Sequence, residues 1–99
     1  MIVEILYVPG CPNYEPAVER VRKVLSSEAL DVDVQGIVVS TDEEARSVLF
    51  LGSPTIRVNG EDVEPNQIKT FGLSCRLYAN RTGVPSEEVV RHAVLRAKS

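Results

Sequence analysis

The sequence predicts an α/β domain in which helices flank a mixed four-stranded sheet. Short segments rich in β-branched residues alternate with segments of helical periodicity, in the order β-α-β-α-β-β-α. The first β-α-β unit is expected to form a right-handed parallel crossover. Asn59-Gly60, between the last two predicted strands, is the strongest hairpin signal in the chain and adds an antiparallel pair.

The first two predicted elements meet at a corner that contains proline and glycine. Residues 2–8 are mostly apolar and rich in β-branched and aromatic types, which predicts a strand buried on both faces. After the interruption at 9–13, apolar residues recur at spacings of three and four from about Pro12, which predicts an amphipathic helix. Pro16 is tolerated only in a first helical turn, so this helix is expected to begin near Cys11.

A second strand and a second helix follow. Residues 31–39 alternate between polar and apolar types and then become apolar, which predicts the strand. Thr41 and Glu44 have the spacing of a capping box and predict a helix that runs to about Phe50. Gly52 is placed to end this helix, because glycine readily adopts the left-handed conformation found at helix C-termini.

The last predicted elements are two short strands and a helix. The strands are expected at 55–58 and 61–64, on either side of the Asn59-Gly60 turn. Ser86, followed by two glutamates, is expected to cap the helix. Its apolar face is formed by Val89, Val90, Ala93, Val94 and Ala97.

The composition is that of an ordinary globular domain. Of the 99 residues, 43% are hydrophobic and 25% charged, so we expect a single domain spanning residues 1–99. Residues 65–85 sustain no period and are interpreted as an insertion. The net charge of −3, with interspersed signs, argues against nucleic-acid and anionic-membrane partners. No apolar run approaches the roughly 20 residues of a membrane span, and Glu4 interrupts the segment where a signal peptide would be apolar, so a cytoplasmic location is expected.

The chain has two cysteines, Cys11 and Cys75, which are too few for a secreted domain cross-linked by disulfides. In a reducing compartment, two cysteines are typical of free thiols, a redox pair or metal ligands. Cys11 lies between a buried strand and a predicted helix N-terminus, where unpaired amides and the positive end of the helix dipole stabilise a thiolate. This position predicts a reactive thiol, and the alternative is a small buried packing residue.

Several motifs, taken in order, resemble one known family. The strand that ends in Val8-Pro9-Gly10-Cys11-Pro12 and continues into a helix looks like the active-site corner of thioredoxin-fold proteins. Ser53-Pro54-Thr55 resembles the cis-proline motif of that family, and Asn59-Gly60 fits its hairpin. The resemblance covers residues 1–64 and 86–98 and is closest to the minimal, glutaredoxin-sized core, including small bacterial thioredoxin-like proteins. It implies a thioredoxin-like fold and a cis peptide bond at Pro54.

The chain departs from the family pattern at one position. Thioredoxins carry a second cysteine three residues after the first, where this sequence has Tyr14 in the run Cys11-Pro12-Asn13-Tyr14. Monothiol glutaredoxins manage with one cysteine, but their Gly-Gly-x-Asp turn has no counterpart here. Glutathione use and cluster binding of the glutaredoxin type are therefore not expected, and no cofactor is predicted.

The candidate site residues are placed at one edge of the predicted sheet. Cys11 and Cys75 are the candidate catalytic thiols, because the hairpin should return the chain toward the edge at which the first strand ends. Cys75 is then a resolving thiol, and the alternative is a packing residue inside the insertion. The resemblance implies a further set of substrate-binding residues: Pro12, Tyr14, Ser53, Pro54 and Thr55.

Three functional hypotheses follow from these residues. The first is a thioredoxin-like thiol redox protein whose partner is a protein or small-molecule thiol or disulfide. If it catalyses the exchange with turnover, it is a thiol-disulfide oxidoreductase. The second is a carrier of a mercury- or copper-class ion held by Cys11 and Cys75. The third is a non-catalytic interaction module that keeps the fold. The sequence specifies no substrate, no reductant and no oligomeric state.

Overall fold

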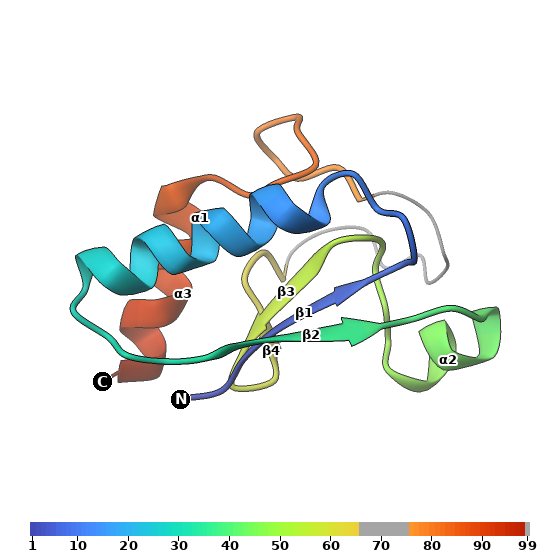
Figure 1. Cartoon of the computed structure of the whole chain (residues 1–99), viewed down its shortest axis with the longest axis horizontal. Coiled ribbons are helices and arrows are strands. Elements are labelled where there is room, and N and C mark those ends of the chain that lie inside the picture. Colours follow the sequence, from blue (N-terminus) through green and yellow to red (C-terminus); the bar gives the residue numbers. More distant parts are fainter. Residues whose placement is uncertain (66–75, 99) are drawn as a thin grey trace.

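The computed structural model describes residues 1–65 and 76–98 and confirms the predicted order of elements. Figure 1 shows a central sheet with helices on both sides. The elements are β1 (Val3–Tyr7), α1 (Tyr14–Ser27), β2 (Val34–Val38), α2 (Asp42–Ser47), β3 (Thr55–Val58), β4 (Glu61–Asp62) and α3 (Glu87–Lys98).

The sheet has four strands in the order β2-β1-β3-β4. β1 pairs in parallel with β2 and antiparallel with β3, so the predicted mixed sheet is confirmed. The β3–β4 hairpin turns at Asn59 and Gly60, whose φ angles of 52° and 81° are those of a two-residue turn with both central residues left-handed. The register places Leu6 opposite Thr55, so β1 ends at the edge of the sheet where β3 begins.

One face of the sheet is covered by two helices. α1 and α3 bury their apolar stripes against residues of β1 and β3, and this is the larger of the two hydrophobic cores (Figure 1). Ile5 on β1, Val21 on α1, Ile56 on β3 and Val94 on α3 are each fully buried there. The predicted face of the last helix is confirmed, because its five apolar residues all pack in or against this core.

The opposite face is covered only in part, by the short helix α2. A smaller core joins Ala45 of α2 to Leu6 of β1, Val39 and Phe50. The alternation of side chains along β1 explains the division, because Ile5 points to the larger core and Leu6 to the smaller one. Thr41 caps α2 as predicted, its hydroxyl accepting a hydrogen bond from the Glu44 amide at 3.1 Å.

Two predicted helix boundaries are wrong. α1 begins at Tyr14, with Asn13 as its N-cap, rather than near Cys11. α2 ends at Ser47, before Phe50, and the left-handed residue that follows it is Leu49 (φ 56°), not Gly52. The Phe50 amide donates to the Ala45 carbonyl at 2.8 Å, which closes the helix in a Schellman motif before the chain reaches Gly52.

Gly52 has a different role, which depends on a distant part of the chain. Its φ is +117°, and a Cβ at this position would lie 3.0 to 3.2 Å from the Cβ, Cα and N atoms of Arg76. The backbone of Arg76 therefore packs directly on Gly52, and a glycine is required for this contact rather than for the end of a helix.

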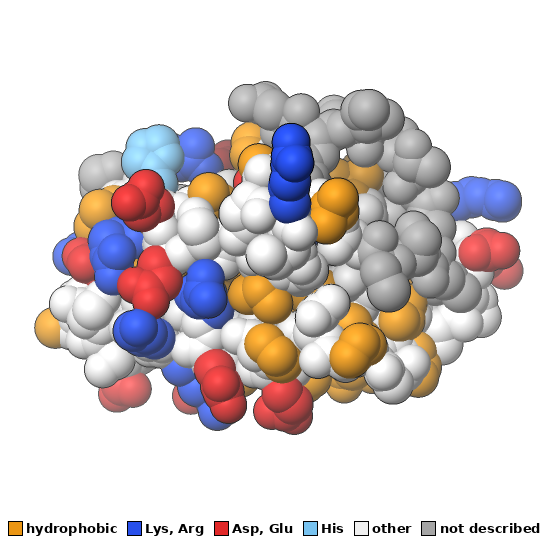
Figure 2. Space-filling view, turned by 90° about the horizontal axis from the view of Figure 1, so that it is seen from above, with side chains coloured by type: hydrophobic (Ala, Val, Ile, Leu, Met, Phe, Trp, Pro, Cys, Tyr) orange, Lys and Arg blue, Asp and Glu red, His pale blue; other side chains and the backbone are white. Residues whose placement is uncertain are grey.

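Charged side chains of both signs are interspersed on the surface seen in Figure 2, toward the end of the molecule where α1 finishes. Ion pairs join α1 and its C-cap residue to α3, between Lys23 and Glu87 at 2.7 Å and between Glu28 and Arg91 at 3.3 Å. The Lys23 ammonium holds the pKa of the Glu87 carboxyl below its usual range, chiefly by hydrogen bonding to it.

Candidate functional site

The fold brings the turn after β1 and the segment before β3 together at one edge of the sheet. Because these two strands are antiparallel neighbours, the end of one lies beside the start of the other. The Val8 amide donates to the Ser53 hydroxyl at 3.1 Å and links the two segments directly. The structure therefore places the predicted Cys11 and Ser53–Pro54 regions at the same edge.

Cys11 lies in a tight turn between β1 and α1. Its amide donates to the Val8 carbonyl at 3.2 Å, and its carbonyl accepts from the Tyr14 amide at 3.3 Å. Gly10 has a φ of +77°, a conformation that glycine adopts without strain, and it allows the chain to turn here. The Cys11 side chain is half-buried and is a free thiol.

The helix that follows leaves part of its N-terminus uncapped. Asn13 is the N-cap, and its side chain makes no capping hydrogen bond. Pro16 stands at the third helical position and has no N–H to satisfy. Cys11 thus precedes the N-cap by two residues, and the positive end of the α1 dipole lies close to it along the chain.

Tyr14 stands where thioredoxins carry their second cysteine, and its ring is turned onto the sheet. It stacks on Tyr7 with the ring centroids 3.8 Å apart. Its hydroxyl lies so close to Gly36 of β2 that a Cβ at Gly36 would collide with it. Burial raises the pKa of the Tyr14 phenol. Pro12, the other predicted binding residue of this turn, is exposed.

Ser53, Pro54 and Thr55 are buried, although sequence reasoning assigned them to substrate. The Ser53–Pro54 peptide bond is cis, as the resemblance implied. The Ser53 carbonyl accepts from the Arg76 amide at 3.0 Å, and the Pro54 carbonyl accepts from the Tyr78 hydroxyl at 2.6 Å. These three residues therefore lie beneath the described segment 76–78.

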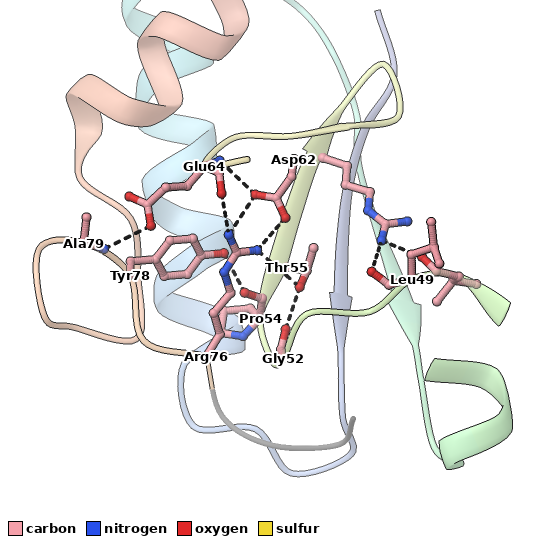
Figure 3. A network of polar contacts seen from close by, with 11 residues as sticks. Leu49, Gly52, Pro54, Thr55, Asp62, Glu64, Arg76, Tyr78 and Ala79 are labelled. Carbon is pink, nitrogen blue, oxygen red and sulfur yellow. Dashed lines mark hydrogen bonds and ion pairs between the residues drawn. The ribbon is translucent and has the colours of Figure 1, made fainter. Parts of the chain in front are cut away.

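We call the polar network built on this segment the Arg76 cluster: Arg76, Asp62, Thr55, Glu64 and Tyr78 (Figure 3). The Arg76 guanidinium donates to both carboxylate oxygens of Asp62, at 2.6 and 2.9 Å, and to the Glu64 carbonyl at 3.0 Å. It also lies 4.3 Å from the centre of the Tyr78 ring. The Arg76 side chain is only 1% exposed, so the ion pair is buried on the arginine side.

Burial also governs the phenol of Tyr78. Removal from water raises its pKa above the ordinary value, and the hydroxyl donates its proton to the Pro54 carbonyl. Sequence reasoning missed Asp62, the partner that holds Arg76. No local signal identifies it, because Asp62 and Arg76 belong to segments separated by the residues 66–75.

Cys75 lies outside the described residues, so its predicted proximity to Cys11 stays a prediction. Within residues 1–65 and 76–98, no group of three or more His, Cys, Asp or Glu side chains is placed to hold a metal ion. In the same part of the chain, no helix combines the length and apolar character needed to cross a membrane.

Comparisons with known proteins identify no relative of this chain. No protein-family model matches the chain, and no curated protein or solved structure matches it either. The arrangement at this edge combines a half-buried free thiol before a helix with an adjacent polar network that is buried and hydrogen-bonded.

Proposed function

We propose that the chain is a thioredoxin-like thiol protein in which Cys11 is the reactive group. The observation that carries the proposal is the position of this free, half-buried thiol in the turn between β1 and α1, two residues before the helix N-cap. Helix N-termini favour the ionised form of a nearby cysteine, and the thiolate is the nucleophile in disulfide exchange.

The chemistry proposed is thiol-disulfide exchange. The Cys11 thiolate attacks one sulfur of a partner's disulfide, which forms a mixed disulfide and releases the other sulfur as a thiolate that takes a proton from water. A second thiol then attacks the mixed disulfide and frees the partner in its reduced form. In the sequence-based assignment, this second thiol is Cys75, and the chain ends as an intramolecular disulfide after a two-electron transfer.

Three further features support the thioredoxin-like assignment. The order of elements, the mixed four-stranded sheet and the cis bond at Ser53–Pro54 all agree with the expectations from the sequence. A reducing, cytoplasmic compartment is part of the proposal, because it keeps both cysteines available as thiols. Ser53 and Pro54 are buried and cannot contact a substrate directly. The substrate contact is therefore proposed for the surface around Cys11 and the exposed Pro12.

The test is the alkylation rate of Cys11 by iodoacetamide at neutral pH. The Cys75→Ser variant is used, so that Cys11 is the thiol that reacts, and the double variant Cys11→Ser/Cys75→Ser is the control that should not react. We expect the folded chain to react roughly tenfold faster than the same chain unfolded in urea, because folding brings the helix N-terminus to the thiol. A folded chain that reacts at the same rate or more slowly contradicts the proposal and favours a non-catalytic module.

A second measurement tests the resolving step. The wild-type chain is incubated with a small aromatic disulfide, and the masses of the products are measured by mass spectrometry. We expect the wild type to end as an intramolecular disulfide and the Cys75→Ser variant to stop at the mixed disulfide. A wild type that also stops at the mixed disulfide removes the resolving role of Cys75 and leaves Cys11 as a single-thiol site.

A further inference from the structure

A second candidate site lies on the face of the sheet that α2 covers only in part. A cavity of about 300 Å³ opens between β3, β4 and the chain that follows α2. Leu49, Leu51 and Pro65 give it apolar walls, Arg57 supplies a guanidinium, and Asp62 also lines it. This volume is at the low end of the range, roughly 300 to 1,000 Å³, of small-molecule sites.

Arg57 retains hydrogen-bond donors that the described structure does not use. One of its terminal nitrogens, Nη2, donates to the Val48 carbonyl at 2.6 Å and to the Leu49 carbonyl at 3.0 Å. The other N–H groups of the guanidinium have no partner among the described residues, and no carboxylate there forms an ion pair with it.

The lack of an ion pair is notable because two carboxylates are the cross-strand neighbours of Arg57. Asp62 lies opposite it on β4, but both oxygens of Asp62 accept from Arg76. Glu4 lies opposite it on β1, and the guanidinium reaches instead to the carbonyls at the end of α2. Both oxygens of the Asp62 carboxylate at the cavity wall are therefore held by Arg76, and no carboxylate among the described residues pairs with Arg57.

Leu49 forms part of the cavity wall in a strained backbone conformation. Its φ of +56° is left-handed, a conformation that favours glycine, and 60% of its surface is exposed at the cavity wall. Ala29 occupies the equivalent left-handed position after α1, with a φ of +55°, in a Schellman motif closed by a Leu30 to Leu25 hydrogen bond of 2.9 Å. Ala29 is therefore a matched reference for the backbone strain at Leu49.

We propose that this cavity binds a small organic carboxylate with a short aliphatic chain. The carboxylate accepts from the unused N–H groups of Arg57, and the aliphatic chain packs against Leu49, Leu51 and Pro65. This site is on a different part of the sheet from Cys11 and does not depend on the thiol.

The probe is hexanoate, and the measurement is a titration of the full chain followed by ¹H–¹⁵N NMR. We expect saturable shifts confined to the amides of residues 48–51 and to the side-chain N–H of Arg57. Hexanamide has the same aliphatic chain without the charge, and we expect it to bind at least about tenfold more weakly. The proposal is overturned if hexanoate gives no saturable shifts, if the shifts are spread over the surface, or if the two probes bind equally.

A pair of variants separates the cavity wall from the backbone strain. Leu49→Gly and Ala29→Gly relieve the same left-handed strain, so both are expected to raise the melting temperature. Only Leu49→Gly removes an apolar wall, so we expect it to weaken hexanoate binding about tenfold while Ala29→Gly leaves binding unchanged. Unchanged binding in Leu49→Gly, or equal loss in both variants, contradicts the proposal. Cys11→Ser should bind hexanoate as the wild type does, which keeps this test independent of the thiol test.

Discussion

The Arg76 cluster and the turn at Cys11 meet at one edge of the sheet but are held in different ways. The buried Arg76, Thr55 and Tyr78 and the partly buried Asp62 and Glu64 form the cluster. Arg76 joins its own segment to Ser53 and to the chain at Asp62 and Glu64. The turn is closed by backbone hydrogen bonds and tied to Ser53 through the Val8 amide, and its thiol stays half-buried. The residues beside the candidate nucleophile Cys11 thus stabilise the fold, while Cys11 itself lies in a segment with fewer side-chain contacts.

The largest expected effect comes from breaking the buried ion pair. Asp62→Ala leaves the Arg76 guanidinium buried without its carboxylate, and we expect a loss of about 3–5 kcal/mol in the free energy of unfolding, measured with urea. The matched control is Glu28→Ala, which removes a partly exposed partner of Arg91 and should cost about 1 kcal/mol or less. Equal effects from the two variants would show that the cluster is no stronger than a surface pair.

The contact between Gly52 and the Arg76 backbone is the next to test. Gly52→Ala introduces a Cβ at a φ of +117° and about 3 Å from Arg76. We expect a loss of about 2 kcal/mol in the free energy of unfolding, because neither the backbone nor the neighbour can relax easily. Gly60→Ala, at a φ of +81° with open space around it, isolates the backbone strain, and a loss in Gly52→Ala no larger than in Gly60→Ala would argue against the close contact.

Tyr78→Phe tests the hydrogen bond over Pro54 and carries a pH dependence. At neutral pH, removal of the hydroxyl leaves the buried Pro54 carbonyl without its donor and should cost about 1–2 kcal/mol. The pKa of Tyr78 is raised in the folded chain, so its stabilising contribution is complete below the ordinary tyrosine value of about 10 and is lost as the pH rises above it.

The wild type should therefore lose stability above about pH 10 more steeply than the Tyr78→Phe variant, as measured by urea unfolding at several pH values. Parallel pH profiles for the two proteins would show that this phenol ionises equally in the folded and unfolded chains.

The smallest expected effects concern the N-cap residues of α2 and α1, of which the second adjoins the Cys11 turn. Thr41→Ala removes the side-chain cap of α2 and should cost about 1 kcal/mol. Asn13→Ala changes an N-cap whose side chain makes no capping hydrogen bond, and we expect a loss of only a few tenths of a kcal/mol. Urea unfolding of both variants checks the difference. A larger loss in Asn13→Ala would mean that the turn at Cys11 is more strongly restrained than its hydrogen bonds indicate.

Periodicity and turn chemistry were sufficient for most of the fold. The order of elements, the hairpin at Asn59-Gly60 and the caps at Thr41 and Ser86 all depend on residues within a few positions of one another. Because these features depend on residues close together in the sequence, they can be predicted without knowledge of the rest of the chain.

The prediction that Gly52 ends α2 was wrong because the position of this glycine is determined by a contact with a distant residue and not by the helix end. Leu49 takes the left-handed position after α2, three residues before the glycine, at a cost that glycine would avoid. Gly52 is needed where Arg76 approaches, and nothing near Gly52 in the sequence announces Arg76. The burial of Ser53 and Thr55 has the same origin, since the segment that covers them lies more than twenty positions further along the chain.

The sequence alone determined which segments are strands and helices, their order, and that a cysteine precedes the first helix, because these properties depend on neighbouring residues and on side-chain periodicity. Only the tertiary structure decided that Arg76 pairs with Asp62, that Tyr14 lies over Gly36 and that Arg57 faces a cavity without an ion-pair partner among the described residues. Such contacts join segments far apart in the chain, and their geometry depends on how the helices and strands pack rather than on any local pattern.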